Sequence, residues 1–368
     1  MARGMSARDR PRIERCEERG DDGSPLAVVH VRVPRAVVPE LCIDERFAEI
    51  GIATSGRLID LAATTARWGT PVGRFPEELI EDAPVGAVGV CPTNFGWQRE
   101  SFLVDRGRVV ALHEDRNVLR GRFLVLGRDP ERWRARAIEL DGGEPRDAVD
   151  AAALADLVVG LEMPQIVRDG RPVPRSEWIA HPRLLADLRN AFDFAHGRGP
   201  ELDPALWVEL RKALPETAAS ALLLDRGLGC RERRVLADPE RLRRLLAAAG
   251  LAHVRVHDMP GAVEIEIDGP LAATRGPLVG IGISAEGDLH ATAVDGRRRD
   301  FPGATIQELA RLLADRGVVT GGLGSAGGDV AVVVKSESGV AIANTPSTID
   351  PATGRGLTRR VPALLVVW

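Results

Sequence analysis

The chain has 368 residues, enough for one large domain or two ordinary ones. Apolar residues make up 44% of it and charged residues 28%, as in ordinary soluble globular proteins, and the formal net charge is −4. This charge gives no general attraction to nucleic acid or to an anionic membrane, and the aromatic content of 4% argues against a base-stacking surface. We therefore predict no nucleic-acid partner and no membrane partner.

The chain begins with a charged stretch. Residues 1–24 are charged and contain several glycines, which predicts a disordered tail. An apolar alternation starts at Leu26 and predicts a strand. Further along, residues 57–66 have the apolar spacing of a helix, and residues 85–90 are typical of a short buried strand.

Two hairpins are predicted next, at residues 102–110 and 165–173, each turned by a glycine shortly after an aspartate. Leucine spacing then favours helices up to residue 250, and Asp238 before a proline is typical of a helix N-cap. We therefore predict a single domain over residues 25–368, with a helical insertion at about 176–250.

Strands are expected again after the insertion. Residues 253–257 and 262–267 alternate in polarity, and residues 278–284 and 289–294 predict a hairpin. The first of these strands has a histidine at each end. Four strand residues span about 13 Å, which is too far for both rings to bind one metal ion.

The clearest helix begins after Thr305. Thr305 and Glu308 have the spacing of a capping box, an apolar face follows, and Gly317 is a natural stop. The last strands are expected at 330–334, 340–343 and 363–367. Short strands outnumber helices and follow one another along the chain. The predicted fold class is therefore α+β, with a mixed or antiparallel sheet core and flanking helices.

The four cysteines are scattered and form no Cys-x-x-Cys pair, so neither a metal site nor a disulfide framework is predicted. The first twenty residues lack the apolar segment of a signal peptide, and no apolar run is long enough to span a bilayer. We therefore expect a cytoplasmic protein. The abundance of alanine, arginine and glycine, with few lysines, is typical of a GC-rich bacterial genome.

A glycine-rich stretch from Gly321 to Asp329 is predicted as a loop between the last helix and the next strand. Its spacing matches the dinucleotide fingerprint, but that fingerprint must leave a strand and open a helix. Here the order is reversed, and the Gly-Lys-Ser/Thr ending of a P-loop is absent. We therefore predict no cofactor. A nucleotide-binding oxidoreductase is the weakest alternative, and NAD titration would test it.

Several motifs occur in a fixed order around this stretch. Gly303-Ala-Thr-Ile-Gln-Glu-Leu-Ala310 resembles the Gly-Ala-Thr-Leu-x-Glu-Leu-Ala of the phosphodiester glycosidase family, and Ala293-Val-Asp-Gly-Arg297 resembles its Thr-Val-Asp-Gly-Arg. Similar matches occur at Gly86–Phe95, Arg275–Gly282, Ile342–Ser347 and Arg360–Val366. The resemblance implies the fold of that family and a small-molecule substrate containing sugar or phosphate.

The resemblance also implies candidate site residues. Arg275, Asp295 and Asp329 are the candidate catalytic residues, with Arg275 as a phosphate contact and Asp329 as a relocated carboxylate. The candidate substrate-binding residues are Asn94, Ser325, Gly327, Gly328, Asn344 and Ser347. We expect a divergent hydrolase, a glycosidase acting within specialised metabolism.

Some positions depart from the family pattern. Ser325 stands where the family has an aspartate, Pro92 where it has an asparagine, and Val279 where it has a threonine. A non-catalytic descendant that binds a ligand or a partner protein is therefore the alternative to an enzyme. A homo-oligomer is left open by the sequence.

Overall fold

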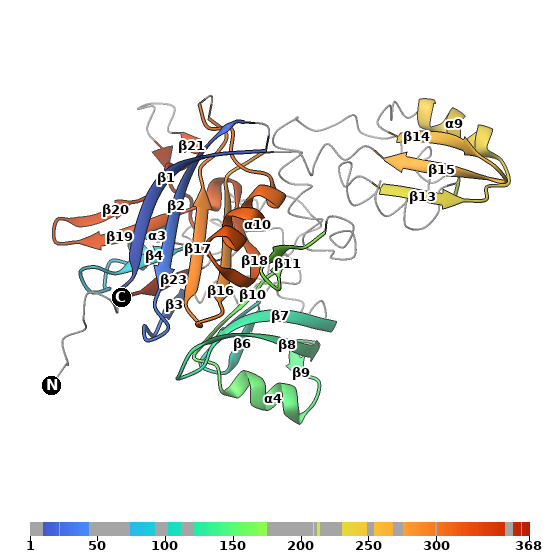
Figure 1. Cartoon of the computed structure of the whole chain (residues 1–368). Coiled ribbons are helices and arrows are strands. Elements are labelled where there is room, and N and C mark those ends of the chain that lie inside the picture. Colours follow the sequence, from blue (N-terminus) through green and yellow to red (C-terminus); the bar gives the residue numbers. More distant parts are fainter. Residues whose placement is uncertain are drawn as a thin grey trace, which may run out of the picture. The chain divides into compact units, whose positions relative to one another are not determined.

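The computed structural model describes residues 10–21, 23–43, 74–92, 102–111, 121–174, 209, 212–213, 230–248, 254–267, 275–298, 300–349, 356–361 and 363–368. The chain divides into two compact units, one of residues 1–173 with 275–368 and one of residues 174–274. Antiparallel sheets with few helices make up the first unit (Figure 1). The predicted α+β class is therefore confirmed.

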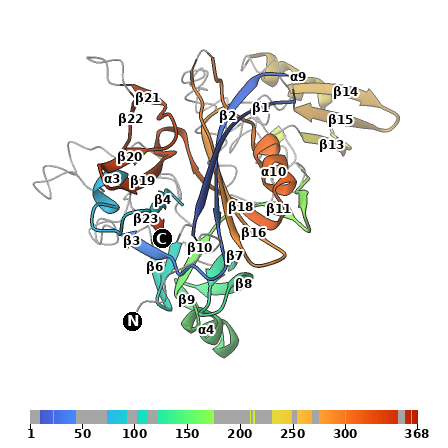
Figure 2. The ribbon, with the colours of Figure 1, turned by 60° about the vertical axis from the view of Figure 1, so that its left-hand side comes forward.

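A seven-stranded sheet organises the first unit, in the order β1-β2-β17-β16-β18-β11-β12 with every neighbour antiparallel. Its strands are β1 (Arg12–Arg19), β2 (Pro25–Val33), β17 (Leu289–Val294), β16 (Leu278–Ser284), β18 (Val318–Ala326), β11 (Gln165–Arg168) and β12 (Arg171–Pro172). Helix α10 (Ile306–Asp315) packs on one face, where Gly280 lets Leu309 and Leu313 approach the strand (Figure 2). Because strand residues alternate between faces, Ile281 and its alternate neighbours point into the main core.

A five-stranded sheet shares that core, in the order β20-β19-β4-β23-β3. Its strands are β20 (Gly339–Ile342), β19 (Val332–Ser336), β4 (Val88–Val90), β23 (Ala363–Val367) and β3 (Glu40–Ile43). Val90, Leu365 and Ile281 belong to one buried cluster, which joins the two sheets face to face. A one-turn helix, α3 (Pro76–Leu79), contacts this second sheet.

A third sheet has six strands in the order β6-β5-β10-β7-β8-β9. Its strands are β6 (Arg108–Ala111), β5 (Phe102–Asp105), β10 (Val159–Glu162), β7 (Gly121–Arg128), β8 (Trp133–Asp141) and β9 (Glu144–Pro145). Helix α4 (Ala148–Ala155) is capped by Asp147, whose carboxylate accepts hydrogen bonds from two backbone N–H groups, and Leu154 joins the apolar cluster of this sheet. A two-stranded ribbon, β21 (Thr348–Ile349) with β22 (Gly356–Leu357), completes the unit.

The predicted disordered tail is wrong in its second half. Residues Arg12–Arg19 form β1, an edge strand paired with β2 along its whole length. The sequence Arg-Ile-Glu-Arg-Cys-Glu-Glu-Arg hides the strand because most of its side chains are charged. Charged residues suit an edge strand, since they discourage pairing with another chain.

The predicted glycine-rich loop is also corrected. Residues up to Ala326 belong to β18, in the interior of the seven-stranded sheet, and only Gly327–Asp329 forms a short 3₁₀ turn, η4. The glycines serve close packing in a strand. A Cβ on Gly322 would overlap Met163, and one on Gly324 would lie 3.1 Å from the carbonyl oxygen of Pro92.

The predicted hairpin turns and the predicted helix cap of the first unit are confirmed. The predicted hairpins at 102–110 and 165–173 are confirmed, with left-handed backbone at Arg106 and Asp169 in their turns. The capping box of α10 is also confirmed, with Thr305 Oγ1 accepting from Glu308 N at 3.1 Å. The predicted helix at 57–66 lies outside the described residues.

The second unit is described only in part, so most of the helical insertion predicted at about 176–250 lies outside the described residues, whereas the strands predicted at 253–257 and 262–267 are confirmed. Its described part contains a three-stranded antiparallel sheet in the order β13-β15-β14, with one helix. The elements are β13 (Cys230–Arg234), α9 (Pro239–Ala248), β14 (Val254–Met259) and β15 (Ala262–Ile267). The predicted cap at Asp238 is confirmed, because its carboxylate accepts from Arg241 N at 2.8 Å. β13 was missed because four of its five residues are charged.

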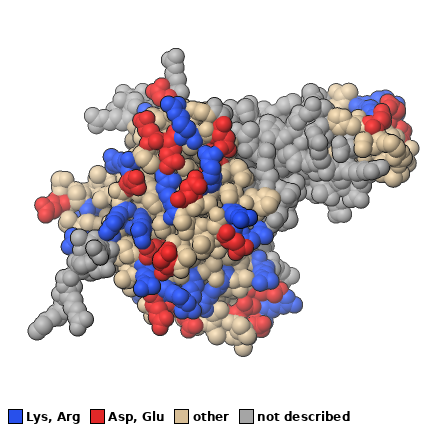
Figure 3. All heavy atoms as spheres, viewed as in Figure 1, with Lys and Arg blue, Asp and Glu red and all other residues tan. Residues whose placement is uncertain are grey.

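Basic and acidic side chains are interspersed over the described residues on the face of the first unit seen in Figure 3. Ion pairs such as Arg32–Asp288 and Arg316–Glu18 join neighbouring elements. A mixed surface of this kind has a weak long-range field. Recognition of an anion by this unit therefore depends on individual arginines in defined positions.

Candidate functional site

The 3₁₀ turn at the end of β18 is the centre of the candidate site. Gly327 has a left-handed backbone (φ 68°), and its N–H donates to the carbonyl oxygen of Pro277 at 2.8 Å. Asp329 closes the turn and is buried, with 7% of its surface exposed. The turn thus places a carboxylate beside two glycines at one end of the seven-stranded sheet.

Two arginines lie against this turn. A Cβ on Gly327 would lie 3.1 Å from Nη2 of Arg297, and a Cβ on Gly328 would lie 2.7 Å from Cδ of Arg359. Both glycines are therefore needed for the arginine side chains to approach the backbone so closely. The two arginines come from distant parts of the sequence, one after β17 and the other just before β23.

The backbone around Arg297 is unusual. Arg297 has a left-handed conformation (φ 59°), and its N–H donates to the carbonyl oxygen of Pro302 at 3.1 Å. Such a conformation in a residue other than glycine persists only where the surroundings impose it, and it is often found at functional sites. The tight hairpin from Arg297 to Pro302 provides that constraint.

The charges around the turn do not balance. Burial and, to a smaller extent, repulsion from Arg359 lower the pKa of Arg297 to about 10, and attraction to Asp329 opposes this shift in part. The repulsion from the second arginine thus outweighs the attraction of the carboxylate. A bound anion would relieve this repulsion, so the geometry suits a phosphate or carboxylate group.

Asp295 holds the neighbouring loop. Its carboxylate is buried and accepts hydrogen bonds from Asn344 Nδ2 at 3.2 Å and from Thr345 N at 2.9 Å. Burial raises the pKa of Asp295, and these hydrogen bonds oppose the increase. These contacts anchor the loop at Asn344 and Thr345 to the end of β17.

Asn344 connects this carboxylate to the chain that follows the turn. Its Oδ1 accepts from Val332 N at 2.7 Å, and its Nδ2 also donates to the carbonyl oxygen of Val330 at 3.2 Å. The predicted ligand-binding residue is therefore a bridge between Asp295 and the strand leaving the site.

Replacing Asn344 with alanine should destabilise the fold by about 2–4 kcal/mol, because it leaves several buried polar groups without their partner. Urea unfolding followed by circular dichroism measures this loss. Ser338→Ala, at an exposed hairpin turn, is the control and should change stability little. A loss below about 1 kcal/mol for Asn344→Ala would contradict the bridging role.

Arg275 also makes contacts other than the predicted ones. Its guanidinium binds the buried carboxylate of Glu308 in a bidentate manner, with distances of 2.9 and 2.6 Å. A third hydrogen bond joins it to the carbonyl oxygen of Gly303 at 2.9 Å. The structure thus places Arg275 in an ion pair at the N-terminus of α10.

The remaining predicted residues have mixed placements. Ser325 is fully buried in β18, where the pairing with β16 is irregular, and its hydroxyl has no hydrogen-bond partner within the described residues. The Ser347 hydroxyl is buried as well and is equally unpaired within that part of the chain. Asn94 lies outside the described residues.

The structure therefore groups Asp329, Gly327 and Gly328 as predicted, and adds Arg297 and Arg359. Arg297 was within reach of sequence reasoning because it ends the motif that contains Asp295. Arg359 had a weaker signal, an arginine pair before the last strand. Among the described residues, no cluster of histidine, cysteine, aspartate and glutamate is arranged to hold a metal ion.

Comparisons with known proteins support the fold. No protein-family profile matches the sequence, and no curated protein matches it. The catalytic domain of zebrafish N-acetylglucosamine-1-phosphodiester alpha-N-acetylglucosaminidase, auto-inhibited by its pro-peptide, is similar with a TM-score of 0.50 and 12% identity. The similarity covers 96% of this chain and 81% of that one.

Two other solved structures give lower scores. A hypothetical protein from Synechocystis has a TM-score of 0.39 and 9% identity, covering 97% of this chain and 62% of that one. A putative exported protein from Burkholderia pseudomallei has a TM-score of 0.37 and 14% identity, covering 94% and 74%. Because both of these TM-scores are below 0.5, the fold relationship is argued from the zebrafish domain, and it is distant.

The fold and the site together define an α+β protein with a distant structural relationship to a phosphodiester glycosidase domain. In the part of the chain that the structure describes, no helix has the length and apolar character needed to cross a membrane. Function has to be argued from the site itself.

Proposed function

We propose that the protein binds the phosphate group of a glycosylated small molecule at Arg297 and Arg359, and that it hydrolyses the bond between sugar and phosphate. The observation that carries this proposal is the pair of arginines against the Gly327–Asp329 turn, where Arg297 interacts electrostatically with both Arg359 and Asp329. The distant likeness to a phosphodiester glycosidase domain agrees with it.

The groups at the turn match the demands of that reaction. Breaking the bond between the anomeric carbon and the phosphate oxygen leaves a negative charge on the departing phosphate and a positive charge on the sugar ring. In this proposal Arg297 and Arg359 stabilise the departing phosphate, and Asp329 stabilises the sugar cation or accepts a proton from the attacking water. Water adds to the sugar carbon, and the products are a free sugar and a phosphate monoester.

Binding is tested first, with inorganic phosphate as the probe. Arg297→Met and Arg359→Met should each weaken phosphate binding roughly 10- to 100-fold, the effect of losing a hydrogen bond to a charged group. Isothermal titration calorimetry measures the dissociation constant. Arg360→Met is the matched control, because it removes the same charge from the next residue along the chain. The Arg360 side chain stacks on Phe75, with its Cζ 4.6 Å from the ring centre.

Equal weakening by Arg360→Met and Arg359→Met would show a general charge effect and would contradict the proposed site. Turnover is tested next on a panel of sugar-1-phosphodiesters. Asp329→Asn should lower kcat while leaving the affinity for phosphate almost unchanged, because the carboxylate acts on the reacting sugar.

A second candidate function is ligand binding without catalysis. The specific observation in its favour is that Asp295 and Arg275 already have structural hydrogen bonds, so two of the three predicted catalytic residues hold the fold. Phosphate binding by Arg297 and Arg359, with no turnover of any member of the substrate panel, would favour this candidate over the hydrolase.

A further inference from the structure

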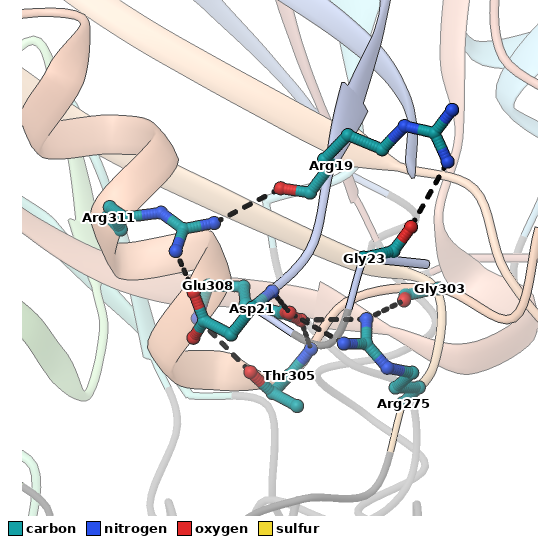
Figure 4. A network of polar contacts seen from close by, with 8 residues as sticks. All are labelled: Arg19, Asp21, Gly23, Arg275, Gly303, Thr305, Glu308 and Arg311. Carbon is teal, nitrogen blue, oxygen red and sulfur yellow. Dashed lines mark hydrogen bonds and ion pairs between the residues drawn. The ribbon is translucent and has the colours of Figure 1, made fainter. Parts of the chain in front are cut away.

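A buried ion pair lies at the N-terminus of α10, outside the candidate site. The side chain of Glu308 is fully buried, and it accepts two hydrogen bonds from Arg275 and one from Thr305 N at 2.8 Å (Figure 4). A buried carboxylate depends strongly on such partners, because an unpaired charge in the interior is highly unfavourable. The Arg275–Glu308 ion pair therefore connects α10 firmly to the segment before β16.

The turn between β1 and β2 lies against this ion pair. Asp21 N donates to Glu308 Oε1 at 2.6 Å, and Arg311 on α10 binds both the Asp21 carboxylate and the carbonyl oxygen of Arg19. Gly20 lies directly over the pair, since a Cβ there would be 2.8 Å from Nη2 of Arg275. Figure 4 shows the backbone N–H of Asp21 and the guanidinium of Arg275 meeting at the Glu308 carboxylate.

A short series of hydrogen bonds connects the Arg275–Glu308 ion pair to the candidate site. Arg275 Nη1 donates to the carbonyl oxygen of Gly303, and the next residues, Gly276 and Ala304, exchange two backbone hydrogen bonds of 3.1 and 3.0 Å. Pro277 follows, and its carbonyl oxygen accepts from Gly327 N. The segment from Arg275 to Pro277 thus connects the ion pair to the turn that carries Asp329.

We infer that Glu308 and Arg275 are positioning residues for the anion site, held in place by the N-terminal hairpin turn. The ion pair fixes the segment from Arg275 to Pro277, that segment fixes the Gly327 turn, and the turn carries Asp329 and lies against Arg297 and Arg359. This inference rests on the proposed function only in taking the turn as an anion site. The mechanical link from Glu308 to Gly327 stands independently.

Hydrogen–deuterium exchange of the full chain tests the link without any ligand. Arg275→Met should increase exchange in the peptide that contains Gly327, because the carbonyl group that holds its N–H is no longer fixed. Arg275→Lys should give an intermediate increase, since lysine keeps the charge but loses the bidentate geometry. Arg316→Met is the matched control, because Arg316 joins the other end of the same helix to Glu18.

Faster exchange at residues 303–308 alone, with the Gly327 peptide unchanged, would overturn the inference and leave the ion pair as a helix cap only. If Arg275→Met does not fold, Gly20→Ala is the second variant. It presses a methyl group against the ion pair without removing a charge, and the same increase at Gly327 is expected.

The affinity for inorganic phosphate tests the connection to binding. Arg275→Met and Glu308→Gln should weaken it roughly 2- to 30-fold, as expected for residues that couple through a network without touching the ligand. Arg316→Met should leave it unchanged. No phosphate binding by the wild-type protein would overturn the proposed function, whereas normal binding by Arg275→Met and Glu308→Gln would overturn only the positioning role.

Discussion

Replacing Gly303 with alanine is expected to destabilise the first unit by roughly 3–5 kcal/mol, combining backbone strain with overpacking. Gly303 has φ of 105°, a region that residues with a Cβ rarely adopt. A Cβ there would also overlap the backbone of Gly276, whose Cα would lie 2.8 Å away. Backbone atoms cannot move aside as the end of a flexible side chain can.

The neighbouring Gly276 provides a matched control. A Cβ on Gly276 would meet nothing within 4 Å, and its φ is not in the left-handed region, so Gly276→Ala should be neutral or slightly stabilising. Urea unfolding of both variants measures the difference. Similar unfolding midpoints for Gly303→Ala and Gly276→Ala would contradict the close backbone packing between the two segments.

Gly303 also shows which signals a sequence carries. It stands two residues before the cap Thr305, in a motif whose helix was predicted correctly because a capping box depends on residues four positions apart at most. The same holds for the hairpin turns, which depend on two or three adjacent residues. Signals confined to one turn of the chain can be read without knowing what packs against it.

The glycine-rich stretch shows the opposite case. Gly322 and Gly324 normally indicate a loop, and their place in an interior strand follows from Met163 and Pro92, which are far away in the sequence. The candidate site has the same character. Arg297 and Arg359 come together because the segment after β17 and the segment before β23 both pass the Gly327–Asp329 turn, and no spacing along the chain contains that information.

His30 on β2 and His290 on β17 form a buried pair that makes the stability of the fold depend on pH. His290 Nδ1 lies 3.2 Å from His30 Nε2, and His30 Nδ1 lies 2.9 Å from Thr292 Oγ1. Burial, with smaller contributions from His290, Arg316 and Arg32, lowers the pKa of His30 to about 3. Burial also lowers the pKa of His290, with Arg32 and Arg316 acting in the same direction and Asp288 and Glu286 opposing.

The sign of the pH effect follows from these directions. In the unfolded chain a histidine takes up a proton near pH 6.5, whereas folded His30 stays neutral down to about pH 3. The unfolded state therefore binds more protons between these values, and stability is fully present above pH 6.5 and falls as the pH is lowered. Between pH 7.5 and 4.5 the loss from His30 is about 2–3 kcal/mol, and His290 adds to it.

We expect His30→Gln to be less sensitive to acid than the wild-type protein, because glutamine keeps a hydrogen-bonding side chain and takes up no proton. Urea unfolding at pH 7.5 and pH 4.5 gives the stability change for each protein, and the difference between them isolates His30 from the carboxylates common to both. His257→Gln, which removes an exposed histidine of the second unit, is the control. Equal losses for the wild-type protein and His30→Gln would show that the buried pair accepts a proton in the folded state, through rearrangement of the neighbouring Asp288 or entry of water between the two strands.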